Sequence, residues 1–185
     1  MSENHTSGKR LKEILGVLKK HHVSRGVTPE KLRHILEDLG PTYVKLGQIM
    51  SMRSDMLPEK YCRELTKLRT DVQPLPFKTI LEIVEQELKR PISQVFAQIQ
   101  ETPAGSASIA QVHPAILLDG RKVVIKVQRP AIHEIMENDI RLMRRASGLL
   151  KLTSVGNLID FRTIIDELWK TSQEEMDFIQ EAKNC

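Results

Sequence analysis

The stretch that decides the fold is AGSASIAQVHPAILLDGRKVVIKVQRP, residues 104–130. Apolar and β-branched residues flank Asp119-Gly120, a dipeptide that is a strong turn signal between two such runs. Pro130 ends the second run, because proline cannot donate a hydrogen bond to a neighbouring strand. The stretch therefore predicts two antiparallel strands joined by a tight turn.

Five small residues open this hairpin, and a lysine lies on its return strand. The small residues form a turn whose backbone N–H groups can approach phosphate closely: Ala104, Gly105, Ser106, Ala107 and Ser108. It is not a Walker A loop, because it lacks the Gly-Lys-Ser/Thr ending and leads into no helix, and such a turn standing alone is usually structural. Lys126 is either a snorkelling lysine on an exposed sheet face or a lysine that binds nucleotide phosphates. The turn upstream of it favours the second interpretation.

Helical periodicity surrounds the hairpin on both sides. After a polar segment, 1–9, that we expect to be disordered, the spacing of apolar residues predicts helices at 11–18, 28–39, 42–53, from 58, at 77–88, around 93–99, from 131 and from 160. Thr28 and Pro29 are the expected N-cap and first residue of the second helix. A short strand is expected near 99–102.

This order of elements predicts an α+β fold with a small antiparallel sheet and a helical N-terminal extension. We expect three segments. Residues 1–27 form a polar tail and a basic amphipathic helix, 28–73 a helical extension, and 74–185 the domain that contains the sheet.

The net charge of +4 comes from the N-terminal third of the chain. Residues 1–60 hold 11 Lys or Arg and 7 Asp or Glu, whereas the remainder holds 17 of each. Interleaved acids make nucleic-acid binding a weak hypothesis, so no nucleic-acid partner is expected. A solvated basic face and a helix lying on anionic lipid both remain open. No apolar run approaches the roughly 20 residues of a membrane span, so we expect a cytoplasmic protein, with or without peripheral membrane contact.

Two further clusters can carry function. Lys45 and Gln48 share one helix face. Gly47 between them lowers helix stability by about 1 kcal/mol relative to alanine, which indicates that another part of the protein or a ligand comes close to the helix there. Near the C-terminus, Asp177 and Glu181 share one helix face, whereas Glu175 lies well round the helix from Asp177. Each cluster also has an ordinary interpretation, as a plain helix and as a solvated acidic turn. The side-chain spacing indicates no metal site.

Together these motifs resemble the UbiB family of atypical kinases, the AarF and ubiquinone-biosynthesis group, from about Leu39 to Asn184. PTYVKLGQ at 41–48 is similar to the family's Lys-x-Gly-Gln motif, and AGSASIAQVH at 104–113 to its Ala-rich loop. VVIKVQRP at 123–130 carries the strand lysine, and EMD at 175–177 is similar to the Glu-x-Asp motif.

The resemblance implies a protein-kinase-like N-lobe that binds ATP, with a helical extension folded over its active site. It implies that backbone N–H groups of 105–108 cover the phosphates and that Lys126 contacts them and pairs with Glu181. It also implies that Glu175 and Asp177 hold Lys45. The family is linked to ATP-dependent, lipid-stimulated support of isoprenoid quinone biosynthesis, and alanine in its nucleotide loop suppresses ordinary kinase behaviour.

The family's catalytic aspartate and metal-binding residues belong to a C-lobe that this sequence lacks. We therefore expect an ATP-binding N-lobe fragment that is inactive alone, with Mg²⁺ bound only in the intact family protein. Two alternatives remain: a module that binds a protein partner through surface the C-lobe would cover, and a membrane-surface module.

Overall fold

The computed structural model describes residues 2–68, 73–150 and 161–178. Contacts divide the chain into two compact units. The helical unit combines 1–68 with 133–185, and the sheet unit is 69–132. Contacts thus group the last two helices with the N-terminal ones, while the predicted segment boundaries at 27 and 73 stay a prediction.

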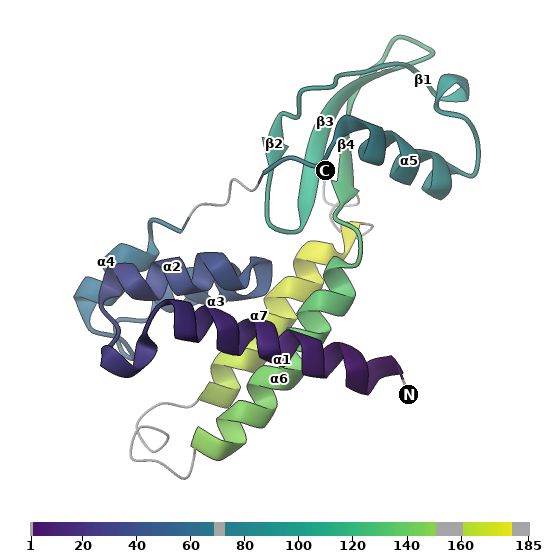
Figure 1. The fold of residues 1–185 in the computed structure, drawn as a ribbon. Helices are drawn as coiled ribbons and strands as arrows, with labels where there is room; N and C mark the ends of the chain where they lie inside the picture. Colours follow the sequence, from purple (N-terminus) through teal and green to yellow (C-terminus); the bar gives the residue numbers. More distant parts are fainter. Residues whose placement is uncertain (1, 69–72, 151–160, 179–185) are drawn as a thin grey trace. The chain divides into compact units, whose positions relative to one another are not determined.

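The sheet unit is built around one long strand (Figure 1). The strands are β1 (Phe96–Ile99), β2 (Gly105–Ser106), β3 (Ala110–Leu117) and β4 (Lys122–Gln128). β3 pairs antiparallel with β4 along its length, and with both β2 and β1 on its other edge. The predicted hairpin and antiparallel sheet are confirmed.

The turn between β3 and β4 explains why Asp119-Gly120 is needed. Gly120 has a φ of 86°, in the left-handed region that glycine adopts without strain. Its N–H donates to the Leu117 carbonyl at 2.9 Å, and Leu117 N–H donates to the Arg121 carbonyl at 2.9 Å. The turn therefore has a three-residue loop, 118–120, rather than the shortest two-residue form.

One face of the sheet packs against α5 (Phe77–Leu88). Ile80 and Val84 of α5 form a buried cluster with Val127, and Ile125 packs against that cluster. Because side chains alternate along a strand, the residues of β4 between these two face the other way. The sheet thus has one apolar face under α5 and one face left to other tasks.

The expected helix around 93–99 is wrong. A 3₁₀ turn, η2 (Ile92–Gln94), is followed by β1, which pairs Phe96 with Leu117 and Ile99 with Ala115. The strand expected at 99–102 is this same β1, displaced toward the N-terminus. Strand pairing with β3 decides the conformation here, and the local periodicity does not report that pairing.

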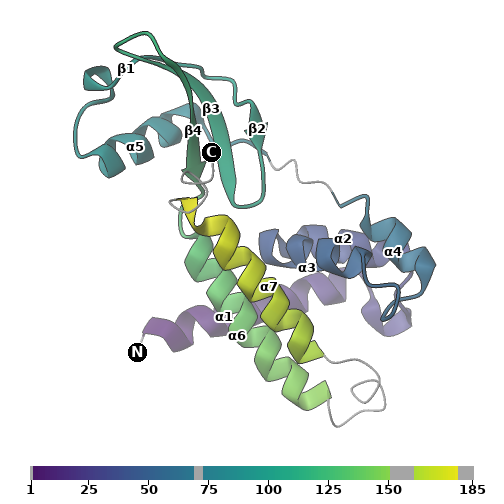
Figure 2. The ribbon, with the colours of Figure 1, turned by 180° about the vertical axis from the view of Figure 1, so that it is seen from behind.

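The helical unit holds the remaining helices (Figures 1 and 2). They are α1 (Ser2–Lys20), the 3₁₀ helix η1 (Val23–Arg25), α2 (Pro29–Leu39), α3 (Pro41–Ser51), α4 (Glu59–Leu65), α6 (Ile132–Leu150) and α7 (Phe161–Met176). The start of α2 is as predicted, with the Thr28 hydroxyl accepting from Lys31 N–H. The expectation of disorder is wrong for residues 2–9, which belong to α1, and Met1 lies outside the described residues.

Two apolar clusters hold the helical unit together. The first joins α2, α3 and α4 through buried residues that include Leu36, Val44 and Leu65, with Ile14 of α1 packed against them. The second joins α3, α6 and α7: Ile49, Ile140, Ile165 and Leu168. Buried residues of α3 belong to both clusters, so α3 links them.

Ion pairs add two cross-links between these helices. The Arg33 guanidinium of α2 donates to Glu64 of α4 at 2.9 Å, and hydrogen bonds from Lys67 and Arg33 lower the pKa of Glu64. Arg10 of α1 donates from Nε and Nη2 to the two oxygens of Asp139 in α6, at 2.7 and 2.9 Å. The hydrogen bond to Asp139 raises the pKa of Arg10.

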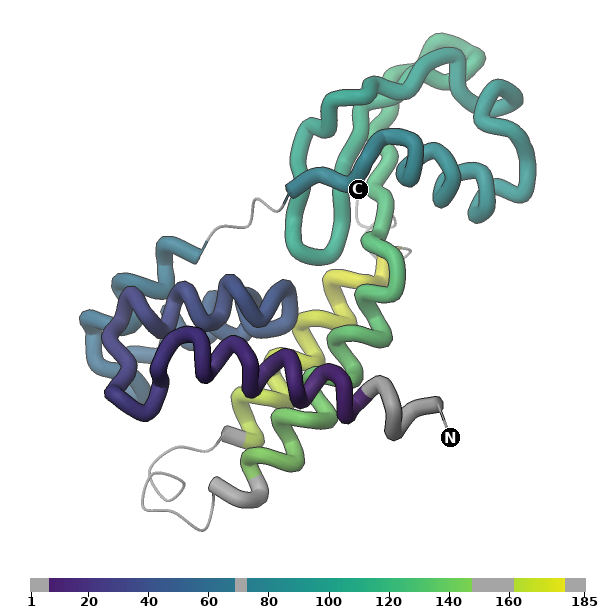
Figure 3. Tube along the Cα trace, viewed as in Figure 1, coloured from purple at the N-terminus to yellow at the C-terminus, as the bar shows by residue number. Residues whose placement is uncertain are grey.

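Within residues 2–68, 73–150 and 161–178, no helix is both long and apolar enough to cross a bilayer. Figure 3 traces the chain through both units.

Candidate functional site

Lys126 lies in β4 on the sheet face opposite α5. Its strand neighbours Ile125 and Val127 point into the α5 cluster, so Lys126 points away from it. The exposed face that the sequence predicted for this lysine is therefore present, and Lys126 is half-buried on it. A cation held in this way on a rigid strand is suited to binding an anion.

The small-residue turn lies in the same row of the sheet as Lys126. Gly105 pairs with Val112 of β3, and Val112 pairs with Lys126 of β4. Gly105 is exposed, and its surroundings leave open space where a Cβ would stand. Neither packing nor a left-handed φ requires glycine at this position. The absence of a side chain leaves room for a ligand to approach the backbone.

Two of the turn's N–H groups are already committed to the sheet. Ala104 N–H donates to the Val112 carbonyl at 2.8 Å, and Ala107 N–H donates to the Ala110 carbonyl at 2.8 Å. Each would have to leave the sheet to reach a phosphate. Fewer backbone N–H groups of residues 105–108 are therefore available to bind phosphate than the sequence predicted.

A residue that the sequence analysis used only as the end of a strand holds this turn. Arg129 donates from Nε to the Ala107 carbonyl at 2.9 Å, and from Nη2 to Ser106 Oγ at 2.8 Å. Its own N–H donates to the Ile109 carbonyl at 2.8 Å. The sequence offered one signal for this role. Arg129 directly follows the return strand of the predicted hairpin, and the other strand of that hairpin directly follows the small-residue turn.

A buried hydrogen-bond chain supports the sheet on the α5 side. Leu75 N–H donates to Gln111 Oε1, the Gln111 amide contacts His113 Nε2, and His113 Nδ1 contacts the Gln100 carbonyl, each at 2.8 Å. A carbonyl can only accept, so His113 carries its proton on Nδ1 and accepts from Gln111 at Nε2. His113 therefore has a structural role in the sheet.

In the helical unit, Lys45 of α3 forms an ion pair with Glu175 of α7. Lys45 is buried, whereas the Glu175 side chain is 45% exposed. The two residues are 130 positions apart, and the second apolar cluster brings their helices together. The structure thus joins one lysine and one carboxylate of the two motifs identified in the sequence.

The unequal burial of this pair predicts unequal mutational effects. Glu175→Ala leaves a buried ammonium without its counter-ion and should lower the free energy of unfolding by about 1–3 kcal/mol. Lys45→Met leaves a carboxylate that water can solvate, and should change it by less than about 1 kcal/mol. Urea denaturation of both variants measures the difference. Equal losses would show that the pair is not held as the structure has it.

Of the other predicted site residues, the structure describes Gln48 and Asp177 but not Glu181. Gln48 is half-buried on α3. Asp177 is exposed just past α7, where its backbone N–H donates to Gln173 and Glu174 carbonyls at 3.1 and 3.3 Å. Glu181, the expected partner of Lys126, lies outside the described residues.

Close packing explains why residue 47 is glycine. A Cβ at this position would stand 2.3 Å from Leu68 Cδ1 and 2.7 Å from Leu36 Cδ1. Both leucines are buried in the first apolar cluster. Gly47 therefore acts through the close approach of α3 to its neighbours.

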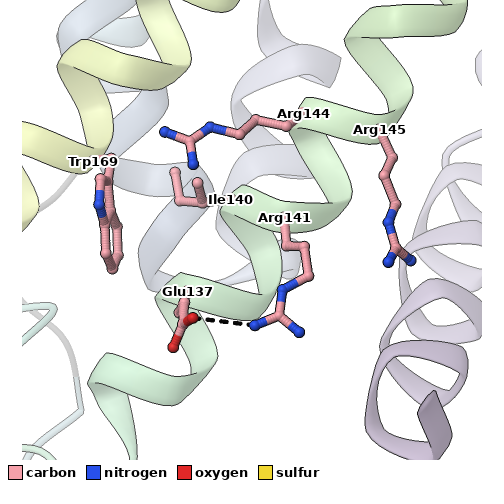
Figure 4. A pocket seen from close by; sticks show the side chains of 6 residues that line it. All are labelled: Glu137, Ile140, Arg141, Arg144, Arg145 and Trp169. Carbon is pink, nitrogen blue, oxygen red and sulfur yellow. Dashed lines mark hydrogen bonds and ion pairs between the residues drawn. The ribbon is translucent and has the colours of Figure 1, made fainter. Parts of the chain in front are cut away.

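A pocket of about 410 Å³ lies between α6 and α7 (Figure 4). It is lined by Glu137, Ile140, Arg141, Arg144, Arg145 and Trp169. Arg141 pairs with Glu137 at 3.1 Å, and Arg144 with Asp166 at 2.7 Å. None of the residues predicted for nucleotide binding that the structure describes lines it. Among the described residues, no group of three His, Cys, Asp or Glu could hold a metal ion.

Comparison with known proteins identifies relatives of this chain. The 43% identical "uncharacterized protein in hydrogenase 1 5′ region" of Clostridium pasteurianum aligns over 95% of this chain and 35% of its own length. A probable protein kinase UbiB of Marinobacter nauticus is 40% identical over 88% of this chain and 29% of its own length. The chain spans about a third of the length of these curated relatives.

Among solved structures, Rv3197 from Mycobacterium tuberculosis, determined in complex with erythromycin, is 34% identical, with a TM-score of 0.48. It covers 79% of this chain, which covers 37% of that structure. The profile of the ABC1 atypical kinase-like domain matches residues 67–185, which include the small-residue turn, Lys126 and Glu175. The α+β structure with its small antiparallel sheet fits an N-lobe portion of such a domain. The chain belongs to the family of ABC1 atypical kinase-like proteins, with UbiB proteins among its relatives.

Proposed function

We propose that this chain is the ATP-binding part of a UbiB-type atypical kinase or ATPase that supports isoprenoid quinone biosynthesis or lipid metabolism. The observation that carries the proposal is the row Gly105–Val112–Lys126. It aligns an open glycine in a small-residue turn with a lysine on the face opposite α5. A cation beside a turn without bulky side chains fits the phosphates of a nucleotide.

The Lys45–Glu175 pair is the second support, because it joins the two motifs outside the sheet. We propose that it fixes α3 and α7 in the arrangement that the intact protein uses when substrate is bound. A bound Mg²⁺ would neutralise phosphate charge in that intact protein. The described residues supply no cluster of ligands for it.

Substituting Lys126 tests ATP binding. Lys126→Ala should weaken ATP binding by about tenfold, since a charge-assisted contact to phosphate is lost. Titration calorimetry, or the anisotropy of a fluorescent ATP analogue, measures the change.

Lys122→Ala is the matched control, because Lys122 lies on the same face of β4 four residues away, opposite Ile116. It should leave the ATP affinity within about twofold, because salt screens the charge of Lys122 at its distance from the proposed site. Unchanged ATP affinity in Lys126→Ala would contradict the proposed site.

One observation favours a second candidate function at a lipid surface. On α1, Ile14 packs inward, but Leu11 and Leu15 are 47% and 55% exposed. They lie one helical turn apart, and the exposed side chains of Lys12 and Lys19 flank them. Exposed leucines beside lysines fit a helix that lies on an anionic bilayer.

A double substitution tests this candidate. Leu11→Ser with Leu15→Ser should lower binding to phosphatidylglycerol-containing vesicles by at least about tenfold, because each leucine loses its burial in lipid. Co-sedimentation measures it, and Val124→Ser, at an exposed apolar position of β4, is the control. Equal sedimentation of the double variant and the wild type would rule out α1 as the lipid contact.

A further inference from the structure

The Arg129 guanidinium lies against the small-residue turn and is tied to it by backbone and side-chain oxygens. Besides Ala107 O and Ser106 Oγ, Nη2 donates to the Gln73 carbonyl at 3.0 Å. These contacts link the end of β4 with the turn and with the segment that leads into α5. They fix the position of the guanidinium relative to the turn.

This cation has no counter-ion in the part of the chain that the structure describes. All three acceptors of its guanidinium are neutral oxygens, and its partial burial lowers its pKa. Arg121, in the same unit, is different, because it donates to the Asp119 carboxylate at 2.8 Å. A partly buried positive charge without a carboxylate leaves a local potential that attracts an anion.

The contacts also decide which donors the turn presents. In a trans peptide, the carbonyl and the following N–H point in opposite directions. When Ala107 O faces Arg129, the Ser108 N–H is therefore turned away from it. Ser106 Oγ also accepts from Arg129, and because Ser106 pairs with Gln111, its side chain lies on the α5 side of the sheet.

We propose that Arg129 is the positioning residue of the phosphate-binding turn: it holds 106–108 so that the Ser108 N–H points toward a polyphosphate, and it supplies positive charge behind the turn. The inference rests on the proposed nucleotide site and extends it. Arg129 acts through the turn and is not itself placed on the phosphates. The ligand class is a polyphosphate chain, with or without a nucleoside.

The test compares Arg129→Gln and Arg129→Lys in the full chain, with ATP and with inorganic tripolyphosphate as probes. Glutamine keeps a hydrogen-bond donor but no charge, and lysine keeps the charge but not the forked geometry. We expect Arg129→Gln to weaken tripolyphosphate binding by about tenfold, and Arg129→Lys to lie between it and the wild type. Arg121→Gln, which removes a charge paired with Asp119, should bind like the wild type.

Hydrogen exchange without ligand gives a second readout. Arg129→Gln should reduce protection of the Ala107 amide, which donates to Ala110, because the turn is no longer tied down. Circular dichroism shows whether the variant folds. If it does not, Ser106→Ala, which removes one acceptor of Arg129, should lower tripolyphosphate affinity severalfold.

The outcomes separate the two proposals. If the wild type binds tripolyphosphate and Arg129→Gln binds it equally well, the role of Arg129 is overturned and the nucleotide site is kept. If Arg129→Gln does not fold, the same conclusion follows from unchanged binding by Ser106→Ala. A wild-type chain that binds neither ATP nor tripolyphosphate overturns the nucleotide site and, with it, the ligand of this inference. Hydrogen exchange then still shows whether Arg129 holds the turn.

Discussion

Arg10→Met is expected to lower the free energy of unfolding of the chain by about 3–5 kcal/mol, because it leaves a buried carboxylate without its counter-ion. Asp139 is fully buried, and both of its oxygens accept from Arg10. Arg10 also donates to the Leu39 carbonyl at 2.6 Å and lies 5.8 Å from the Tyr43 ring centroid. One guanidinium thus joins α1, α2, α3 and α6.

Two further variants show whether the loss comes from the unpaired charge. Arg53→Met removes a guanidinium that pairs on the surface with Asp55 and Glu167, and should change stability by no more than about 0.5 kcal/mol. Arg10→Met combined with Asp139→Leu removes both charges of this pair and should recover much of the loss. Urea denaturation measures all three. A loss below about 1 kcal/mol for Arg10→Met would contradict the buried pair.

Gly47→Val is expected to lower the free energy of unfolding by about 2–3 kcal/mol through overpacking. The added Cβ alone would overlap Leu68 and Leu36, and Leu65 lies 3.7 Å from it. These leucines belong to a buried cluster and have little room to move. Equilibrium urea denaturation of the variant measures the loss.

The control for Gly47→Val is the same change at Gly16 of α1, where nothing lies within 4 Å of an added Cβ. Its effect should stay within about 0.5 kcal/mol, the difference in helix propensity. A double-mutant cycle with Leu68→Ala adds a second check, because the smaller side chain makes room for valine and should reduce the cost of Gly47→Val. Equal effects at Gly47 and Gly16 would contradict the packing.

Features set by neighbours in the sequence were predictable. Asp119-Gly120 predicted the hairpin, Thr28-Pro29 the start of α2, and the alternation around Lys126 its exposed face. Gly47 indicated a close contact because glycine within a helix is unfavourable. In each case a local conformational preference and the folded structure agree.

Features set by distant neighbours were not predictable. Arg10 and Asp139 are 129 positions apart, and each alone looks like a surface charge on a helix. Strand β1 exists because β3 pairs with it, although its own residues also suit a helix. The role of Arg129 depends on the turn that β3 brings alongside it, which no periodicity in the sequence reports.

The buried hydrogen-bond chain of the sheet unit also specifies strand register. Because Gln111 and His113 both lie on the α5 side of β3, a slip of β3 by one residue would carry both to the opposite face. The bonds to Leu75 and Gln100 would break together, leaving several polar groups buried without partners. Apolar side chains alone would tolerate several misalignments of so small a sheet. The buried hydrogen-bond chain permits only one strand register, and this register keeps Lys126 and Gly105 in the same row.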